Sequence, residues 1–538
     1  MRARIEDGVV YSPYPDVEML NCSFYEAVKK AALANPGKVV LIDDATALTL
    51  GDFHARLRRY AAGFQQHGLR PGDRVCVHIG NSVENFVAMW GCVVAGASIV
   101  LAKPSLTARE LRYQMCDSDS THLLVEPTLV EKAAKASADL PLKGRFTVGS
   151  FAAEGFVSMG QLSNIDEDTF EEVSVKDPRD CILAILYTSG TTGLPKGVEL
   201  THHGFLANIG MWRWTSPWDD SDVVLLPTPI THGSGLLSIT ISVLVGTTCV
   251  IVPPSQSLSD IAKVIDKHKV TAAILLHWHL QTLVDEMRRT GQRLPGLRRV
   301  CTGGYPLSQR LYDEIRAAFG KDLQCLANVY AMTEAMALIS SPSWEHATGV
   351  DMGFPAPATQ FKIVDTATGT RLGPNQTGEI RFRAPTVMKG YYKRPKETAD
   401  FFDEEGWCKS GDAGYYDEDG RIHFVQRFKE MIKCMDNQVV PTELEHMLLL
   451  EHSQDVVDIC VVGIPDRKYG EAPAAAVVLR NKLSQQELAD LSRRIKATVA
   501  ENFAAHKQLY GGVFFVDSIP KTESGKTNRT AVLQKCAP

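Results

Sequence analysis

Apolar and polar residues follow two different patterns along this chain. Residues 49–66 carry apolar side chains at the 3.6-residue spacing of an amphipathic helix, and Ser23 followed by Glu26 forms the capping-box pattern that opens an earlier helix. Short apolar runs that end at Gly, Pro or polar turns indicate strands at 181–187, 247–252, 272–276 and 298–304. Strands that alternate with helices predict parallel sheets and an α/β fold.

The most apolar stretch covers residues 86–102 and contains Gly91 and Gly96. It is shorter than the roughly 20 apolar residues that a bilayer-spanning helix needs. We therefore expect a buried helix followed by a strand, and no integral membrane segment.

The pattern changes near Gln426-Arg427. Beyond it a helix, two strands and a further helix are expected at 441–450, 455–464, 472–480 and from Ser484 onwards, where Ser484 and Glu487 form another capping box. The last helix has the apolar face Leu488, Leu491, Ile495, Val499 and Phe503. We predict a large N-terminal domain of residues 1–426, with several subdomains and parallel sheets, and a small mobile α+β domain of residues 427–538, because 538 residues are too many for one core.

Composition narrows the class of partner. A formal net charge of −6 argues against a nucleic-acid or anionic-membrane surface, so small molecules are the expected partners. The twelve cysteines are scattered and form no CxxC pair, which is typical of reduced thiols. The amino terminus lacks the apolar stretch of a secretory signal and the carboxyl end carries no SKL-type tripeptide, so a cytoplasmic location is expected.

Residues 187–197, YTSGTTGLPKG, have the composition of a phosphate-binding loop. They hold five hydroxyl side chains, three glycines and one lysine directly after an apolar run. Glycines let the backbone N–H groups approach an anion, and the hydroxyls and the lysine add further donors. The GxxxxGK[ST] loop is absent, because Pro520 stands where Gly525-Lys526-Thr527 would require a glycine, and a kinase or GTPase is therefore excluded.

Four further segments follow in order: VYAMTE at 329–334, GEIRFRAPTVMKGYY at 378–392, GWCKSGDAGYYDEDGRI at 406–422 and PKTESGKTNR at 520–529. Together with the loop they resemble the adenylate-forming superfamily, which includes acyl-CoA synthetases, 4-coumarate-CoA ligases, luciferases and peptide-synthetase adenylation domains. The resemblance extends over nearly the whole chain. It implies ATP, Mg²⁺ and CoA as the cofactor and substrate set.

The resemblance also implies roles for particular residues. The ATP and AMP site would comprise Thr188, Ser189, Gly190, Thr191, Thr192, Gly193, Lys196, Gly303, Gly304, Tyr330, Thr333, Asp412 and Arg427. Within this set Tyr330 would lie against adenine and Asp412 would accept the ribose hydroxyls. Glu334 would hold Mg²⁺, with Thr191 beside it, and a carboxylate suits that hard cation.

Three residues are implied to act in catalysis: Lys526, Lys433 and His232. Lys526 would reach from the small domain to the reacting carboxylate and phosphates, and Lys433 would face the site in the second step. The acyl pocket would include His232, Gly233, Tyr305 and Ala331. Tyr305 and Ala331 stand where relatives have alanine and glycine, so we expect a narrower pocket. A structural role for His232 remains open.

Two positions near the predicted domain boundary depart from the family pattern. The hinge between the domains has Gln426 in place of the usual aspartate, and Asp436 replaces a glycine beside the expected path of CoA. Thioester formation is thus less firmly implied than adenylation. His277-Trp278-His279 could offer a metal pair, but alternation in a β-like stretch without a third ligand favours packing, and we assign no zinc.

The sequence therefore predicts an ATP-dependent carboxylic acid:CoA ligase that forms an acyl-AMP and then transfers the acyl group to CoA after the small domain rotates about residues 426–427. No carrier-protein domain is expected in cis. Two alternatives remain: a luciferase-like adenylating oxygenase, and a nucleotide-binding regulator with impaired thioester formation, which Gln426, Asp436 and Ala384 motivate. The acid itself, aryl, medium-chain or branched, is not specified.

Overall fold

The computed structural model describes most of the chain, and its contacts divide into two units. It describes residues 1–538 except 163–164, 189–193, 217, 255–256, 305–306, 343–346, 348–349, 436, 523–525 and 537–538. The first unit comprises Met1–Lys362, Arg381–Lys409 and Asp417–Ile422, and the second comprises Ile363–Ile380, Ser410–Tyr416 and His423–Pro538. The boundary expected at residues 426 and 427 stays a prediction.

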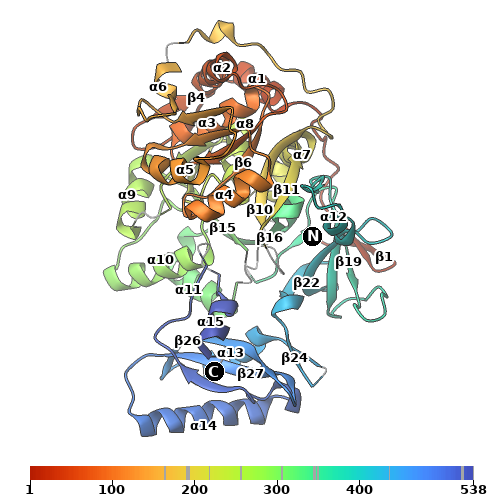
Figure 1. The fold of residues 1–538 in the computed structure, drawn as a ribbon. Coiled ribbons are helices and arrows are strands. Elements are labelled where there is room, and N and C mark those ends of the chain that lie inside the picture. Colours follow the sequence, from red (N-terminus) through yellow and green to blue (C-terminus); the bar gives the residue numbers. More distant parts are fainter. Residues whose placement is uncertain are drawn as a thin grey trace. The chain divides into compact units, whose positions relative to one another are not determined.

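Two large sheets build the first unit (Figure 1). Within the described residues, one sheet has eight strands in the order β21 (Gly390–Tyr391), β11 (Lys196–Thr201), β10 (Ile182–Thr188), β6 (Ser98–Leu101), β5 (Arg74–His78), β7 (His122–Val125), β8 (Gly144–Thr147) and β9 (Val157–Ser158). Its strands from β10 to β9 pair in parallel, whereas β11 pairs in antiparallel fashion with β10 on one side and with β21 on the other.

The second sheet has nine strands over the same described ranges. Their order is β18 (Phe354–Pro355), β17 (Ala337–Ser341), β16 (Cys325–Met332), β15 (Arg299–Gly303), β14 (Ala272–Ile274), β12 (Val223–Leu226), β13 (Thr248–Ile251), β3 (Val39–Ile42) and β4 (Ala47–Thr49). The central pairs, from β16 to β3, are parallel, and the edges are antiparallel. The α/β fold class and the parallel sheets expected from the sequence are confirmed.

Helices of the first unit lie between these strands in the chain. They are α1 (Phe24–Ala34), α2 (Leu50–Gln66), α3 (Val83–Val94), α4 (Ala108–Asp117), α5 (Val130–Ser137), α6 (Met159–Leu162), α7 (His202–Thr215), α8 (Gly233–Val245), α9 (Leu258–His268), α10 (His277–Thr290), α11 (Gln309–Phe319) and α12 (Pro395–Phe401). The capping box of Ser23 and Glu26 opens α1 as expected, and Thr49 caps α2. The stretch 86–102 forms the buried α3 and the strand β6, as the sequence predicts.

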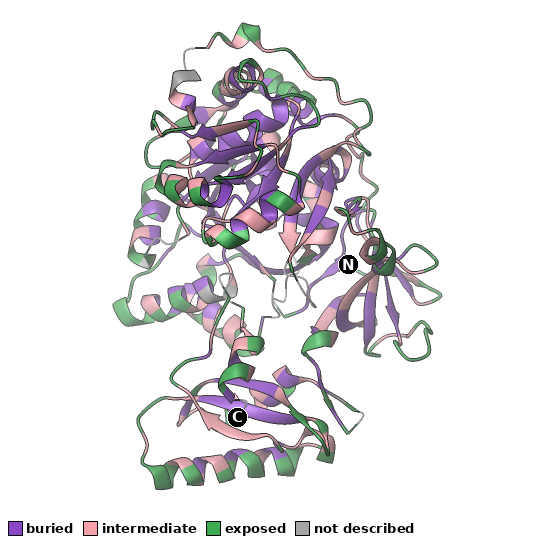
Figure 2. Cartoon of the chain, in the orientation of Figure 1, coloured by how far each residue is buried: buried purple, intermediate pink, exposed green. Residues whose placement is uncertain are grey.

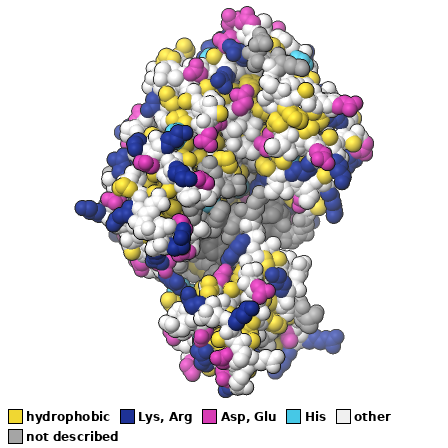
Figure 3. Space-filling model, turned by 90° about the vertical axis from the view of Figure 1, so that its left-hand side faces the viewer, with side chains coloured by type: hydrophobic (Ala, Val, Ile, Leu, Met, Phe, Trp, Pro, Cys, Tyr) yellow, Lys and Arg dark blue, Asp and Glu magenta, His cyan; other side chains and the backbone are white. Residues whose placement is uncertain are grey.

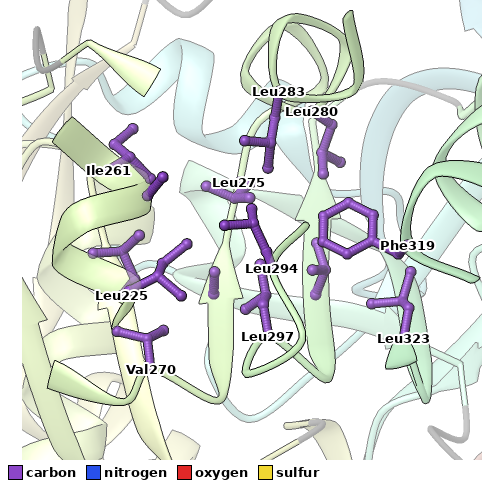
Figure 4. Packing of buried hydrophobic residues seen from close by; sticks show 14 of the residues in the cluster. Leu225, Ile261, Val270, Leu275, Leu280, Leu283, Leu294, Leu297, Phe319 and Leu323 are labelled. Carbon is purple, nitrogen blue, oxygen red and sulfur yellow. The ribbon is translucent and has the colours of Figure 1, made fainter. Parts of the chain in front are cut away.

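One core of the first unit fills the space between the nine-stranded sheet and α9, α10 and α11. Figure 4 shows Leu225 and Val270 beside Ile261 of α9, with Leu280 and Leu283 of α10 and Phe319 of α11 directed into the same cluster. In Figure 2 the strands are buried while the outer faces of these helices are exposed. Burial of so many large apolar side chains supplies the main stabilisation of this layer.

One local expectation was wrong. The sequence suggested a β-like stretch at residues 277–279, but these residues open α10. The alternation there is only three residues long, whereas Leu280, Leu283, Val284 and Met287 are buried at spacings of three and four residues, which fixes a helix.

A third sheet has six strands in the part of the chain described. Their order is β1 (Arg4–Glu6), β2 (Val9–Tyr11), β19 (Gln360–Val364), β20 (Gly378–Arg383), β22 (Cys408–Tyr416) and β23 (Ile422–Arg427).

The second unit carries a sheet of five strands within its described residues. It runs β25 (Asn437–Val439), β24 (Ile432–Cys434), β27 (Gly470–Leu479) and β26 (Val456–Asp466), and β28 (Gly512–Phe515) also pairs with β27. The helices are α13 (Pro441–Glu451), α14 (Gln485–Asn502) and α15 (Arg529–Cys536). The predicted face of α14 is confirmed, because Leu491, Ile495 and Val499 are fully buried against α13 and the sheet.

Two further features concern the surface. None of the helices formed by the described residues has both the length and the apolar character that crossing a bilayer requires. On the face drawn in Figure 3, Lys and Arg side chains lie among Asp and Glu side chains rather than in one basic stripe.

Candidate active site

The ends of the predicted phosphate loop form the neck of a β-hairpin. Strand β10 ends at Thr188, β11 begins at Lys196, and these two residues face each other in antiparallel register. Residues Ser189, Gly190, Thr191, Thr192 and Gly193 lie outside the described residues. The loop thus connects two antiparallel strands, unlike the strand-to-helix turns that cradle phosphate in Rossmann and P-loop proteins.

The hairpin neck is anchored by the end of α4, which lies beside it (Figure 1). The hydroxyl of Tyr187 donates a hydrogen bond to Oδ2 of Asp117 at 2.8 Å, and Arg394 forms an ion pair with Oδ1 of the same residue at 2.6 Å. The hydroxyl of Tyr113 donates to the carbonyl oxygen of Pro195 at 2.9 Å. Burial and the Asp117 carboxylate both raise the pKa of Tyr187, so this phenol remains a donor. Sequence reasoning missed these anchors.

Lys196 and Glu334, predicted to serve the same triphosphate, meet at the side chain of Tyr391. The ammonium nitrogen of Lys196 lies 5.1 Å from the centroid of the Tyr391 ring, a cation–π contact. The hydroxyl of Tyr391 donates to Oε1 of Glu334 at 2.8 Å. Burial raises the pKa of Tyr391 and the nearby Glu334 carboxylate raises it further, which keeps the phenol protonated. The structure therefore brings Lys196 and Tyr391 of the eight-stranded sheet together with Glu334 of the turn that follows β16.

Backbone contacts fix this arrangement. Tyr391 pairs with Val198 of β11, two residues after Lys196 in the chain, and the N–H of Met388 donates to the carbonyl oxygen of Glu334 at 2.8 Å. Segment 388–391 therefore connects the phosphate-loop strand to the turn after β16. In the sequence, Tyr391 belongs to the triplet Gly390-Tyr391-Tyr392, which by itself indicates no role for this side chain.

Glu334 has the chemistry that Mg²⁺ requires. Among the described residues, its Oε1 accepts from Tyr391 while Oε2 has no hydrogen-bond partner, and the side chain is half-exposed. Mg²⁺ is commonly held by one or two carboxylates together with water and substrate phosphates, so this single open carboxylate oxygen fits the ion. Thr191, the other predicted metal residue, lies outside the described residues.

The carboxyl ends of β15 and β16 place several predicted residues side by side. Gly303 pairs with Val329 in parallel register, and a β-carbon on Gly303 would lie 2.9 Å from the Val329 carbonyl oxygen, so only glycine fits. Gly304 has a φ of +82°, which also favours glycine. On β16, Tyr330 is buried and Ala331 is exposed, and Thr333 opens the 3₁₀ turn Thr333–Ala335 that carries Glu334. Tyr305 lies outside the described residues.

His232 caps the N-terminus of α8. Its Nδ1 lies 2.8 Å from the Ser234 hydroxyl and accepts the Ser234 backbone N–H at 3.3 Å. Gly233 begins the helix close to β10, since a β-carbon there would lie 3.3 Å from a methyl carbon of Leu186. The capping contacts give His232 the structural role that the sequence left open, and its catalytic role and place in an acyl pocket stay predictions.

In the second unit, Asp412 and Arg427 form the predicted pair. Asp412 is 2 % exposed, and Nε of Arg427 lies 3.2 Å from its Oδ1. Arg427 is about half exposed. The structure thus brings the two residues together, and their binding of ribose stays a prediction.

Gln426, the unusual hinge residue, is also buried and is held at both ends of its amide. Its Nε2 donates to Oε2 of Glu430 at 2.9 Å, and its Oε1 accepts from the Thr442 hydroxyl at 3.0 Å. Glu430 in turn lies 3.7 Å from Nε of Arg529, just beyond the Lys526 loop in the chain. An aspartate could not donate to Glu430, so the neutral amide suits its surroundings.

The two predicted catalytic lysines of the second unit are both exposed. The carbonyl oxygen of Lys526 accepts a hydrogen bond from the Thr522 N–H at 2.6 Å. Lys433 lies on β24 of the predicted hairpin, and its N–H donates to Oε2 of Glu471 at 2.6 Å. Asp436 lies outside the described residues, while its neighbour Met435 adopts a φ of +52°.

A shallow groove of about 370 Å³ borders this hairpin in the second unit. It is lined by Lys433, Met435, Lys468, Tyr469, Gly470 and Glu471. The ring of Tyr469 stacks on that of Tyr510 with centroids 4.0 Å apart.

His279 behaves as a packing residue. It is buried within α10, and burial lowers its pKa to about 4, so the imidazole is neutral at physiological pH. In the part of the chain that the structure describes, no three His, Cys, Asp or Glu side chains are arranged to hold a metal.

Known proteins match the chain over nearly its whole length. Residues 28–392 match the family described as AMP-binding enzyme, and residues 443–526 match the AMP-binding enzyme C-terminal domain. The 4-coumarate-CoA ligase of Pinus taeda is 32 % identical, with 98 % of this chain and 97 % of that protein covered. 4-Coumarate-CoA ligase 5 of Oryza sativa subsp. japonica is 34 % identical, with 99 % and 98 % covered.

Solved structures agree. O-succinylbenzoate coenzyme A synthetase from Bacillus subtilis, in complex with AMP, superposes with a TM-score of 0.78 at 26 % identity, with 95 % of this chain and 98 % of that one covered. An anthranilate CoA ligase in complex with anthranoyl-AMP gives a TM-score of 0.84 at 21 % identity, with 96 % and 98 % covered, and thus shares the fold.

Proposed function

We propose, from the premise that this chain belongs to the AMP-binding enzyme family, that it is an ATP-dependent carboxylic acid:CoA ligase. It is an AMP-forming acid–thiol ligase that uses ATP and CoA. The observation that carries the proposal is the meeting of Lys196 and Glu334 at Tyr391, because phosphate and metal chemistry require a cation and a carboxylate in one place.

The reaction has two steps. In the first, a carboxylate oxygen of the acid attacks the α-phosphorus of ATP, the bond to the bridging oxygen breaks, and pyrophosphate leaves. In the second, the CoA sulfur attacks the acyl carbon, the bond to AMP breaks, and the thiol proton passes to solvent. Both steps depend on holding anions close together, so positioning and electrostatics supply most of the catalysis.

The residues of the first unit divide the work of the first step. The hairpin neck presents Lys196 to the phosphates, and the Tyr187–Asp117–Arg394 contacts hold that neck in place. Mg²⁺, when bound through Glu334, would neutralise charge on the phosphates. Tyr330, Gly303 and Gly304 at the adjoining strand ends are assigned to the nucleotide.

Residues of the second unit receive roles on the basis of the family resemblance. Asp412 and Arg427 are assigned to the ribose, and Lys526 to charge stabilisation during adenylation. Lys433 is assigned to the thioester step. The cytoplasmic location stays a prediction.

The substrate class follows from the relatives. Several of them are named 4-coumarate-CoA ligases, so we propose an aryl or arylalkenoic acid as the substrate. The luciferase-like and regulatory alternatives are not favoured, because the matched relatives are ligases.

An acid-dependent AMP-release screen tests the function. Hydroxycinnamic, benzoic, medium-chain and branched acids are supplied with ATP, with and without CoA. We expect AMP release with at least one aryl acid and formation of its CoA thioester when CoA is present. ATP binding without AMP release under every acid would contradict the proposal.

A further inference from the structure

Tyr391 lies between two groups of opposite charge that do not pair with each other. Within the described residues, Lys196 makes a cation–π contact with the Tyr391 ring and no ion pair with a carboxylate, while Glu334 binds the Tyr391 hydroxyl. One side chain thus serves both residues, with its face towards the ammonium and its hydroxyl towards the carboxylate.

The chemistry of the two contacts differs from that of an ion pair. A Lys–Glu pair in a partly buried site would engage both charges, and ATP or Mg²⁺ would have to break it before binding. An aromatic ring attracts the ammonium without cancelling its charge. A phenol fixes one carboxylate oxygen and leaves the other for a cation.

The backbone and the packing around Tyr391 hold the ring in this position. Its N–H donates to the Thr398 hydroxyl at 2.9 Å. Its ring packs edge-to-face against that of Phe401, with the ring centroids 6.2 Å apart. Its pairing with Val198 places it beside the strand of Lys196. The position of the ring is therefore fixed by two separate elements, α12 and β11.

We propose that Tyr391 is a positioning residue that prevents an ion pair between Lys196 and Glu334. Lys196 is thereby available to the phosphates of ATP, and Glu334 is available to Mg²⁺. This inference rests on the proposed function of the same site. The two roles of Tyr391 can be tested separately, because the hydroxyl orients Glu334 and the ring holds Lys196.

Tyr391→Phe tests the hydroxyl. ATP affinity is measured by calorimetry in EDTA and then across a titration of free Mg²⁺. We expect affinity in EDTA within about twofold of wild type, and about a tenfold rise in the Mg²⁺ concentration at half-saturation, the effect of losing one hydrogen bond to a charged group. Tyr392→Phe is the matched control. It removes the hydroxyl of the neighbouring residue, which donates to Asp119 at 2.7 Å, and its ATP affinity and Mg²⁺ dependence should match those of the wild type.

Tyr391→Leu tests the ring. Without it Lys196 should pair with Glu334, and ATP affinity in EDTA should fall about tenfold. Adding Glu334→Gln to Tyr391→Leu should restore that affinity, because the competing carboxylate is gone. Thermal melting without ligand, expected to be near wild type for Tyr391→Phe, shows that the variants fold.

The outcomes separate the two proposals. Wild-type Mg²⁺ dependence in Tyr391→Phe, or no restoration in the double variant, overturns the role of Tyr391 while leaving the ligase function intact. A folded wild-type protein that binds no ATP at any Mg²⁺ concentration overturns the function, and this inference with it.

Discussion

Asp117, at the end of α4, accepts a hydrogen bond from Tyr187 at 2.8 Å, and the two residues lie 70 positions apart in the chain. Asp117 also pairs with Arg394, so one carboxylate joins the phosphate-loop neck to the segment that carries Tyr391. Its side chain is only 10 % exposed, which strengthens both contacts. The precision of the site thus depends on a residue outside every motif.

Asp117→Asn should weaken both stability and nucleotide binding. The amide cannot hold Arg394 as an ion pair, so we expect a loss of about 2 kcal/mol in the free energy of unfolding, and weaker ATP binding because the neck is less constrained. Urea denaturation and calorimetry measure the two effects. Asp119→Asn is the control: Asp119 is 46 % exposed, and its loss should cost under about 0.5 kcal/mol. Equal effects of the two changes would refute the anchoring role.

Lys526→Ala should slow the first step selectively. Loss of one charged donor to the transition state is expected to reduce acid-dependent pyrophosphate exchange by about 10²–10³-fold. Exchange at the wild-type rate would remove Lys526 from adenylation.

Lys433→Ala is the matched lysine change in the same unit. We expect pyrophosphate exchange to remain within about threefold of wild type, while thioester formation from preformed acyl-AMP falls by at least about tenfold. A parallel loss in both steps would show that Lys433 is not specific to thioester formation.

Buried histidines should make the protein acid-sensitive. Burial lowers the pKa values of His78, His202 and His279 to about 4. Because these folded-state values lie below the ordinary value near 6.5, the unfolded chain binds protons more readily. Their stabilising contribution is therefore intact above pH 6.5 and is lost as the pH falls from about 6.5 towards 4.

His202→Asn isolates one of these groups. Nδ1 of His202 accepts the Phe24 N–H at 3.1 Å, and the asparagine oxygen can replace that acceptor without titrating. We expect the free energy of unfolding of the variant, measured by urea denaturation, to fall less steeply than that of the wild type between pH 6.5 and 4. The difference between the two proteins should reach at most about 3 kcal/mol. The exposed His446→Asn should keep the wild-type profile. Identical slopes for both variants and wild type would contradict the assignment.

Ala331→Gly should shift the preference of the protein towards bulkier acids. Ala331 is exposed at the end of β16, in the position assigned to the acyl pocket. Removing its methyl group should shift the kcat/KM ratio of a bulky over a small aryl acid by up to about tenfold towards the bulky one. A competition assay with the two acids measures this ratio, and no change would place Ala331 outside the acyl pocket.

Local signals in the sequence predicted much of the fold. Capping boxes and 3.6-residue periodicity located α1, α2 and α14, because these depend on neighbours within four residues. The start of α10 was missed, since a three-residue alternation resembles a strand until the buried positions beyond it are considered.

The site was predictable only where a motif contains it. Tyr391 and Tyr392 are adjacent and alike in the sequence, yet one hydroxyl reaches Glu334 and the other reaches Asp119. Successive side chains of an extended chain point to opposite sides, and the pairing of β21, which ends at Tyr391, with β11 decides which side each hydroxyl reaches. Asp117 and Arg394 are 277 residues apart, and no local pattern indicates such a contact.

The hairpin neck has a consequence for how this loop can vary. Thr188 and Lys196 face each other across an antiparallel ladder, and side chains along a strand alternate between its two faces. Inserting or deleting a single residue within β11, between Lys196 and Val198, would force a bulge or turn Lys196 away from Tyr391, which pairs with Val198. The number of residues in β11 beside the loop should therefore be more tightly restricted in evolution than the length of the connecting loop itself.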